Sequence, residues 1–325
     1  MICIHLENND PYFNLAAEEY LLKNESDQFF LLWRNSPAII VGRNQNALAE
    51  INEDYVRDNN IPVVRRLSGG GAVFHDLGNI NFTLISRTRN KEGINFKKFA
   101  RPIVKALNKM GVNAEFDGRN DLSINGQKIS GNAQHIWKGN TMHHGTLLYN
   151  SNVKDLANAL RPDELKFQDK AVKSVRKRIT NIISHLPEPA GNDEFCTRLF
   201  TMVSSDLEGS RIAGLSREQE KRIYLLREDK YTTWSWNFGA TPPYTHRKKI
   251  RARGGTIELI LNVRQGIIQD AHIYGDFFGK HEISHLTDQL VGLRHEKKAI
   301  AAVLDGLKLD DFMWQVSTSE FLKLI

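Results

Sequence analysis

The stretch RRLSGGGAVFHDLGNINFT, from Arg65 to Thr83, decides the fold more than any other part of the sequence. Its Ser68-Gly69-Gly70-Gly71 turn joins two runs typical of strands, Val63–Arg66 and Ala72–His75, and no helix follows it. Three consecutive glycines remove every Cβ and leave backbone N–H groups free to face a ligand. A P-loop and a dinucleotide fingerprint both need a helix at this point, so neither applies. The bare pattern leaves two interpretations, a ligand-binding loop or an ordinary glycine-rich hairpin turn.

Short strand patterns and amphipathic helix patterns alternate on both sides of this turn. We expect further strands at Ile2–Leu6, Phe29–Trp33, Ala38–Val41, Asn81–Ser86, Val112–Phe116, Lys128–Gln134 and Gly145–Tyr149. We expect helices at Phe13–Leu22, Glu53–Asn59, Phe96–Met110, Val153–Leu160, Asp193–Ser205 and Ser216–Lys230. This mixture predicts a large α+β domain.

A change in composition marks a second domain. Trp234–Tyr244 (WSWNFGATPPY) carries two prolines and an aromatic cluster, which is typical of a packed junction. Beyond it, Thr256–Val263 and Ile267–Tyr274 alternate apolar and polar residues around Gln265-Gly266, which predicts a hairpin, and a helical pattern fills the rest. We therefore predict a large domain over residues 1–244 and a small α+β domain over residues 245–325.

The composition excludes several classes of protein. With 41% hydrophobic and 25% charged residues in 325, the chain is neither disordered nor fibrous. Its only cysteines, Cys3 and Cys196, exclude a disulfide scaffold and a cysteine-rich metal cluster. No run of about 18 apolar residues and no secretory pattern is visible, so we expect a cytoplasmic protein that does not cross a membrane.

The net charge of +6 is concentrated in two segments. Arg161–Thr180 carries +4 and His246–Arg253 carries +5, so the remainder sums to −3. Each segment is either a solvated face or a site for phosphate or an acidic protein. No nucleic-acid motif occurs and aromatic residues do not interleave with these runs, so we expect no nucleic-acid partner.

Two more segments carry polar side chains suited to chemistry. In GRNDLSINGQKISGNAQ (Gly118–Gln134), Asn120 and Asp121 suit a ribose, an adenine edge or a magnesium ion. Lys128 is either a solvated edge residue or, in a pocket, a charge that stabilises a developing negative charge. His143 and His144 are adjacent on a strand and point to opposite faces, so we expect no shared zinc site.

Together and in this order, the motifs resemble the lipoate–protein ligase A family of the biotin/lipoate protein ligase superfamily. The resemblance covers the whole length of the chain. The shared pieces are DPYFNLAAEE (Asp10–Glu19), LLWRN (Leu31–Asn35), VGRNQN (Val41–Asn46), RRLSGGGAVFHDLGN (Arg65–Asn79), GRNDL (Gly118–Leu122), KISGNA (Lys128–Ala133), HHGTLL (His143–Leu148), KSVRKRITN (Lys173–Asn181), WSWNFG (Trp234–Gly239) and GGTIEL (Gly254–Leu259). The resemblance implies a large mixed-sheet catalytic domain of the biotin/lipoate ligase type and a small C-terminal accessory domain.

The family's reaction implies two steps and several partners. Lipoate and ATP would give lipoyl-AMP and pyrophosphate, with Mg²⁺ screening the triphosphate. The acyl group would then move to the acceptor lysine of lipoyl domains, in 2-oxoacid dehydrogenase E2 subunits or the glycine cleavage H protein. Lys128 matches the family's catalytic lysine, which contacts the carboxyl and α-phosphate oxygens. We expect a monomer.

Site residues follow from the resemblance, position by position. Those implied to bind lipoate are Leu15, Ala17, Trp33, Arg66, Ser68, Gly70, Gly71, His75, Ser130, Gly131, Ala133 and His144. Those implied to bind ATP or AMP are Gly71, Val73, Phe74, Asn79, Asn120, Asp121, Lys128, Lys173, Arg176 and Arg178, with Asp121 a candidate Mg²⁺ contact. The stretch from 163 to 181 matches a loop that folds over the adenylate in the family. Leu67 departs from the family pattern, because some relatives have serine there.

Three alternatives stay open. An octanoyl or lipoyl transferase of the same superfamily would need an activated thiol, yet Cys3 and Cys196 lie outside every motif above. A non-catalytic lipoyl-domain-binding protein would not need Lys128 or the glycine turn. Biotin ligase is a weaker rival, because its usual biotin-site sequence is missing.

Overall fold

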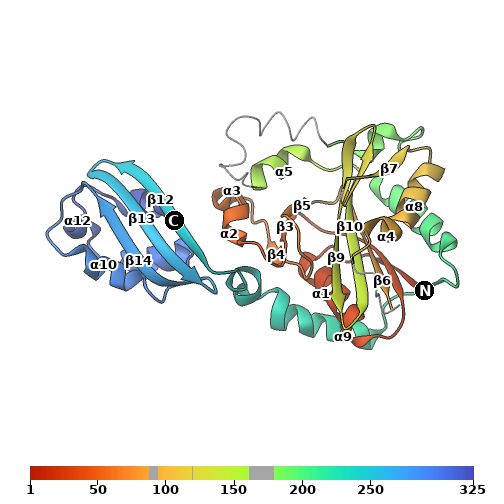
Figure 1. Ribbon diagram of the computed structural model, residues 1–325, viewed down its shortest axis with the longest axis horizontal. Helices are drawn as coiled ribbons and strands as arrows, with labels where there is room; N and C mark the ends of the chain where they lie inside the picture. Colours follow the sequence, from red (N-terminus) through yellow and green to blue (C-terminus); the bar gives the residue numbers. More distant parts are fainter. Residues whose placement is uncertain (88–93, 119, 161–178) are drawn as a thin grey trace. The chain divides into compact units, whose positions relative to one another are not determined.

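The computed structural model describes residues 1–87, 94–118, 120–160 and 179–325, which divide into two units, Met1–Thr233 and Trp234–Ile325. A mixed eight-stranded sheet forms the centre of the first unit (Figure 1). Strands β1 and β2 are parallel and so are β1 and β11, while the other neighbours are antiparallel. In sheet order the strands are β11 (Arg211–Ile212), β1 (Ile2–Leu6), β2 (Phe29–Arg34), β6 (Asn79–Ser86), β10 (Asn140–Leu148), β9 (Gln127–Trp137), β8 (Asp121–Ile124) and β7 (Ala114–Asp117).

A separate three-stranded sheet holds the glycine turn. Strand β3 (Ala38–Val41) lies between β4 (Val63–Arg65), to which it is parallel, and β5 (Val73–His75), to which it is antiparallel. The Ser68–Gly71 turn joins β4 to β5, as the sequence predicts, but the two strands are not neighbours. The interpretation as a plain hairpin turn is therefore wrong, because β3 is inserted between its two arms.

Helices cover the large sheet on both faces (Figure 1). On one face α4 (Phe96–Lys109) and α8 (Asn192–Asp206) bury apolar residues such as Ile103 and Leu199 against Phe82 of β6. On the other face lies α1 (Pro11–Asn24), whose Glu18 is hydrogen-bonded to Thr83 of β6. The remaining helical segments of this unit are α2 (Ala47–Glu50), α3 (Glu53–Asp58), α5 (Val153–Ala159), η1 (Ile182–His185), α9 (Arg217–Leu226) and η2 (Arg227–Tyr231).

The start of α1 is set by local chemistry. Asp10 caps the helix, because its side chain accepts a hydrogen bond from the backbone N–H of Tyr12, and Pro11 occupies the first turn. Both faces of α1 are buried, including the polar side chains of Asn14, Glu18 and Glu19. Buried polar groups need partners, so the helix carries polar contacts into the interior of the unit.

The second unit is a three-stranded antiparallel sheet packed against helices. Residues Ile257, Leu259, Leu261 and Val263 alternate along β13 and form its core. The elements are η3 (Ser235–Gly239), β12 (Tyr244–Ala252), β13 (Gly255–Arg264), β14 (Ile267–Gly275), α10 (Ile283–Leu290), α11 (Lys297–Leu304), α12 (Leu309–Phe312), α13 (Thr318–Phe321) and η4 (Leu322–Leu324). The α+β class predicted for both units is confirmed.

Some elements were not expected from the sequence. The C-terminal hairpin gains a third strand, β12, whose basic residues Arg247, Lys249 and Arg251 alternate outward and hide its period of two. The sequence also did not predict strands β8 and β11 and helix α2. Each has only two to four residues, which is too short for a periodic pattern to show. Among the helices that the structure describes, none is long and apolar enough to cross a membrane.

Candidate functional site

A pocket of about 180 Å³ lies against the face of the large sheet that α1 covers. Strand register explains which side chains meet there. Trp33, Asn81 and Thr146 stand opposite one another on β2, β6 and β10, and Leu31, Thr83, His144 and Ala133 form the neighbouring row of that face. The small sheet supplies Ile40, Val73 and His75, and the turn supplies Arg66, Gly70, Gly71 and Ala72.

The pocket gathers twelve of the predicted site residues, from segments far apart in the sequence. These are Leu15, Trp33, Arg66, Gly70, Gly71, Val73, His75, Asn120, Lys128, Gly131, Ala133 and His144. Four others touch the lining without being part of it: Ser68 contacts His144, Asn79 contacts Asn81, Asp121 contacts Lys128 and Ser130 contacts Asn132. Ala17 and Phe74 are buried and are not among the lining residues. Lys173, Arg176 and Arg178 lie outside the described residues, as does most of the stretch from 163 to 181.

Arg66 holds the glycine turn in place by hydrogen bonds. Its guanidinium donates to Ser68 Oγ at 3.0 Å and to the carbonyl oxygens of Gly69 and Gly71 at 2.8 Å, and it also reaches the Ile40 carbonyl. Burial lowers the pKa of Arg66 to about 10, which leaves it charged at neutral pH. The resemblance implies that Arg66 binds lipoate. In the structure these donors bind the loop itself.

A second buried arginine fixes the neighbouring loop. Arg65 is fully buried, and its Nη1 donates to the carbonyl oxygens of Gly42, Arg43 and Gln45 at 2.7–3.2 Å. Gly42 lies directly under the turn, because a Cβ built on it would come 2.0 Å from the Gly70 carbonyl oxygen. The two adjacent arginines therefore hold the two loops that form this wall of the pocket.

His144 belongs to a buried chain of hydrogen bonds. Its Nε2 lies 2.6 Å from Ser68 Oγ and its Nδ1 lies 2.9 Å from Glu18 Oε1. Thr83 donates to the same Glu18 oxygen, and Trp33 Nε1 donates to Thr83 Oγ1. The order Ser–His–Glu matches a nucleophilic triad, but Ser68 is fully buried and does not line the pocket. We interpret the chain as a frame that orients His144 and Trp33.

Lys128 faces the pocket beside a polar turn. Its Nζ lies 2.7 Å from Asp121 Oδ1, and its side chain stays 36% exposed. A Cβ on Gly131 would come 3.3 Å from this Nζ, so the glycine leaves room for the ammonium group. Asn120 is held by paired hydrogen bonds with Asn132. The backbone of Lys128 also accepts from Thr180 N at 3.0 Å. The interpretation as a solvated edge lysine is replaced by that of a pocket lysine.

His75 lines the pocket as a neutral imidazole. Burial, with the charges of Arg66 and His144 adding to it, lowers its pKa to about 3. His143, by contrast, points to the other face, where it stacks on Phe99 of α4 with ring centroids 5.5 Å apart. The prediction that the two adjacent histidines face opposite sides is confirmed.

Sequence reasoning missed six lining residues. These are Ile40, Ala72, Asn81, Asn132, Gly145 and Thr146. Asn81 and Thr146 lie two residues along a strand from the predicted residues Asn79 and His144, so alternation could have found them. Asn81 also has a buried amide nitrogen that forms no hydrogen bond with a described residue. Glu18, which holds His144, was missed because its partners lie 65 and 126 residues away in the sequence.

The described residues contain no group of three or more His, Cys, Asp or Glu side chains that could hold a metal ion. Mg²⁺ in phosphate-transfer sites needs only one or two carboxylates, since substrate phosphates complete its shell. Asp121 meets that minimum, although one of its oxygens is bound to Lys128.

Both cysteines lie in the main core, among the residues that α4 and α8 pack against the sheet. Burial raises the pKa of Cys3 and raises that of Cys196 to about 11. A thiol that stays protonated and lies outside the pocket does not serve as a nucleophile.

Replacing Cys3 and Cys196 together with alanine will leave turnover close to that of the wild-type protein, because neither sulfur reaches the pocket. Steady-state kinetics with the candidate acid substrate checks this, and the unfolding temperature of the double variant serves as the control. Loss of turnover in a folded double variant would revive the thioester route.

Comparison with known proteins identifies the family of this chain. Residues 10–204 match the family described as lipoyl protein ligase A/B catalytic domain, and residues 241–325 match bacterial lipoate protein ligase C-terminus. The chain belongs to the lipoate–protein ligase family. Lipoate-protein ligase LplJ of Bacillus subtilis is 40% identical over the whole of both chains. The resemblance seen in the motifs, and the enzyme class it implies, are confirmed.

Solved structures of the family agree with the fold. A bipartite lipoate protein ligase of Thermoplasma acidophilum, studied with its E2 lipoyl domain, has a TM-score of 0.66 at 29% identity over 73% of this chain and 96% of its own. LipL1 of P. falciparum in complex with lipoate has a TM-score of 0.62 at 26% identity over 99% and 97%. A lipoate-protein ligase A bound with ATP has a TM-score of 0.61 at 25% identity over 73% and 98%.

Proposed function

We propose that this lipoate–protein ligase activates lipoate with ATP and transfers the lipoyl group to lipoyl domains. The observation that carries the proposal is one pocket that combines apolar walls, such as Leu15 and Trp33, with the ammonium group of Lys128. The walls suit an acyl chain, and the cation suits its carboxylate. The lipoate-bound and ATP-bound relatives support both substrates.

In the first step, a lipoate carboxylate oxygen attacks the α-phosphorus of ATP, and pyrophosphate leaves. Both reactants are anionic, so positioning and a fixed positive charge supply most of the rate gain. Lys128 provides that charge, and Asp121 holds its ammonium group in place at 2.7 Å. Mg²⁺, which screens the triphosphate, would take Asp121 as its protein carboxylate.

In the second step, the ε-amino group of the acceptor lysine attacks the acyl carbonyl carbon, and AMP leaves with the former carboxyl oxygen. Lys128 again stabilises the negative charge on the reacting oxygens. We propose as acceptors the lipoyl domains of 2-oxoacid dehydrogenase E2 subunits and the glycine cleavage H protein. The E2 lipoyl domain studied with the Thermoplasma ligase supports the first of these.

Several finer assignments belong to the same proposal. Residues 1–244 would form the catalytic domain and residues 245–325 the accessory domain. The remaining predicted site residues, including Ala17, Phe74 and the three basic residues outside the described part of the chain, keep their proposed roles. We also propose that the enzyme acts as a cytoplasmic monomer.

With lipoate and MgATP, the purified protein will release pyrophosphate, and added lipoyl domain will become labelled by a radioactive acid. A coupled pyrophosphate assay and gel autoradiography measure the two steps separately. Octanoate and biotin serve as comparison acids. No release with any of the three acids would contradict the ligase proposal, and would favour a non-catalytic lipoyl-domain-binding protein.

A further inference from the structure

The imidazole of His75 has one ring nitrogen with a partner and one without. The side chain is 3% exposed and lines the pocket. Its Nδ1 lies 3.0 Å from Asn35 Nδ2, while no described residue bonds its buried Nε2. A buried polar atom without a hydrogen-bond partner carries a free-energy cost, and a ligand in the pocket that His75 lines is a candidate partner for it. Which of the two nitrogens carries the proton therefore decides what a ligand must offer.

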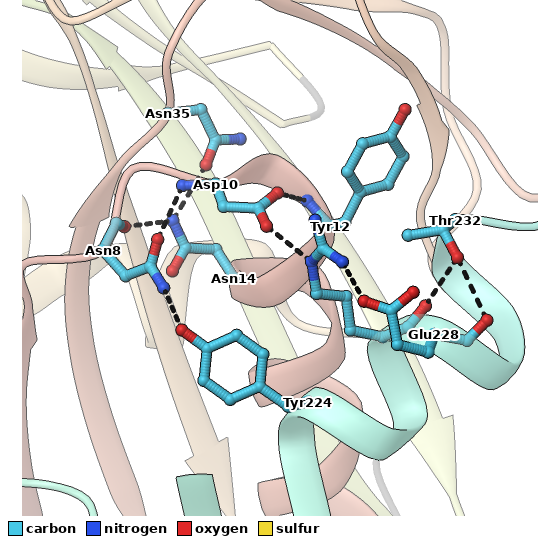
Figure 2. A network of polar contacts seen from close by, with 9 residues as sticks. Asn8, Asp10, Tyr12, Asn14, Asn35, Tyr224, Glu228 and Thr232 are labelled. Atoms are coloured by element: carbon cyan, nitrogen blue, oxygen red, sulfur yellow. Dashed lines mark hydrogen bonds and ion pairs between the residues drawn. The ribbon is translucent and has the colours of Figure 1, made fainter. Parts of the chain in front are cut away.

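Two backbone carbonyls determine the answer. Asn14 Nδ2 lies 2.7 Å from the Asn8 carbonyl oxygen and 3.0 Å from that of Arg34. Because carbonyl oxygens only accept, this end of the Asn14 amide must be its nitrogen. The same nitrogen lies 2.9 Å from Asn35 Oδ1 (Figure 2). The Asn14 nitrogen shares its two hydrogens among these three oxygens and cannot accept, so an Asn35 nitrogen facing it would set donor against donor. Asn35 therefore turns its oxygen to Asn14 and its nitrogen to His75.

Amide N–H groups only donate, so His75 Nδ1 must be the bare, accepting nitrogen. The single proton of the neutral ring then sits on Nε2, the atom without a partner. We propose that Asn35 is a positioning residue that holds His75 in this form, so that the pocket offers a directed N–H donor to an acceptor atom of the bound acid. The identity of the acid rests on the proposed function, and the acceptor is a carboxyl oxygen or a dithiolane sulfur.

Further hydrogen bonds hold the loop that carries Asn8, whose carbonyl oxygen fixes the Asn14 amide (Figure 2). Asn8 Nδ2 donates to the hydroxyl of Tyr224 in α9, and the backbone N–H of Asp10 donates to Asn8 Oδ1. Arg227, which begins η2, donates to Asp10 Oδ2 at 2.6 Å. The loop before α1 is thus tied to the α9–η2 segment, and its Asn8 carbonyl stays where Asn14 needs it.

The first test determines which ring nitrogen of His75 carries the proton in the ligand-free protein, where no ligase activity is involved. Nitrogen-15 NMR will show a bare Nδ1 and a protonated Nε2 for His75. In Asn35→Asp the carboxylate can still accept from Asn14 but cannot donate, so the ring proton will move to Nδ1. Asn24→Asp, the same change at an exposed position of α1, will leave the spectrum of His75 unchanged. A protonated Nδ1 in the wild-type protein, or no change in Asn35→Asp, would overturn the proposal.

The second test measures lipoate binding by calorimetry without ATP, in variants whose unfolding temperatures match. His75→Gln keeps an amide N–H near the Nε2 position, whereas His75→Asn keeps one only near Nδ1. Asn35→Asp and His75→Asn will raise the Kd for lipoate about tenfold or more, and His75→Gln will raise it less. Equal losses in the two His75 variants, or an unchanged Kd in Asn35→Asp, would overturn the proposal.

Octanoate identifies the acceptor atom. Octanoate shares the carboxylate of lipoate but lacks the two sulfurs. If Asn35→Asp and His75→Asn raise the Kd for both acids by the same factor, the acceptor is a carboxyl oxygen. If they raise the Kd for lipoate alone, the acceptor is a sulfur. A wild-type protein that binds neither acid would contradict the proposed function, while the NMR result on the ligand-free ring would stand.

Discussion

Replacing Lys128 with alanine will lower the rate of adenylate formation by about a hundred- to a thousandfold, the cost typical of losing one preorganised charge-stabilising group. The fold will persist, because the Lys128 side chain is 36% exposed and lines the pocket. Single-turnover formation of pyrophosphate from lipoate and MgATP measures the effect.

Asp121→Asn is the matched control for this prediction. It removes the ion pair with Lys128 but keeps the ammonium group, so we expect a smaller loss than in Lys128→Ala. If the two variants lose the same activity at saturating Mg²⁺, which offsets a weakened Mg²⁺ contact of Asp121, Lys128 would act through the pair and not on the reacting oxygens. Near-normal activity of Lys128→Ala would remove its proposed role altogether.

Replacing Gly42 with alanine will cause the second large loss of activity. A Cβ at this position would come 2.0 Å from the Gly70 carbonyl oxygen and 3.1 Å from its carbon, so the Ser68–Gly71 turn must move. The turn supplies Gly70 and Gly71 to the pocket, and a shift of about 1 Å in a positioning element can cost about a hundredfold in rate. Steady-state kinetics with lipoate will show this loss.

Gly69→Ala is the contrasting variant in the same turn. A Cβ there has no neighbouring atom within 4 Å and its backbone has no positive φ, so activity will stay near that of the wild type. Similar losses in Gly42→Ala and Gly69→Ala would mean that the turn tolerates no side chain for a reason other than contact with Gly42. Circular dichroism of both variants checks that the fold is retained.

Much of the site could be predicted because motif and register are local properties. Three adjacent glycines predict a turn that a ligand can approach, and alternation along a strand places His143 and His144 on opposite faces. Residues such as Trp33 and Lys128 then entered through the resemblance to a family whose motifs span the chain. The family matches confirm that resemblance over most of both units.

The elements that were missed have a common physical cause. Strand β12 is rich in exposed basic residues, so its alternation of charged outward and half-buried inward positions resembles a solvated charge run. The insertion of β3 between β4 and β5 depends on pairing between segments that are more than 20 residues apart. Local patterns do not report such pairings, because loop closure joins them only in the folded chain.

By itself the sequence determined the family resemblance and the two α+β units, because those follow from motifs and short-range periodicity, and the resemblance then implied most residues of the pocket wall. Only the tertiary structure decided what those residues do. It directs the guanidinium of Arg66 into its own loop, brings Glu18 to His144, and aligns Asn14 and Asn35 so that His75 keeps its proton on Nε2. The reason is that hydrogen bonds are directional. Their donors and acceptors become defined only when distant segments meet in a buried space where every polar atom needs a partner.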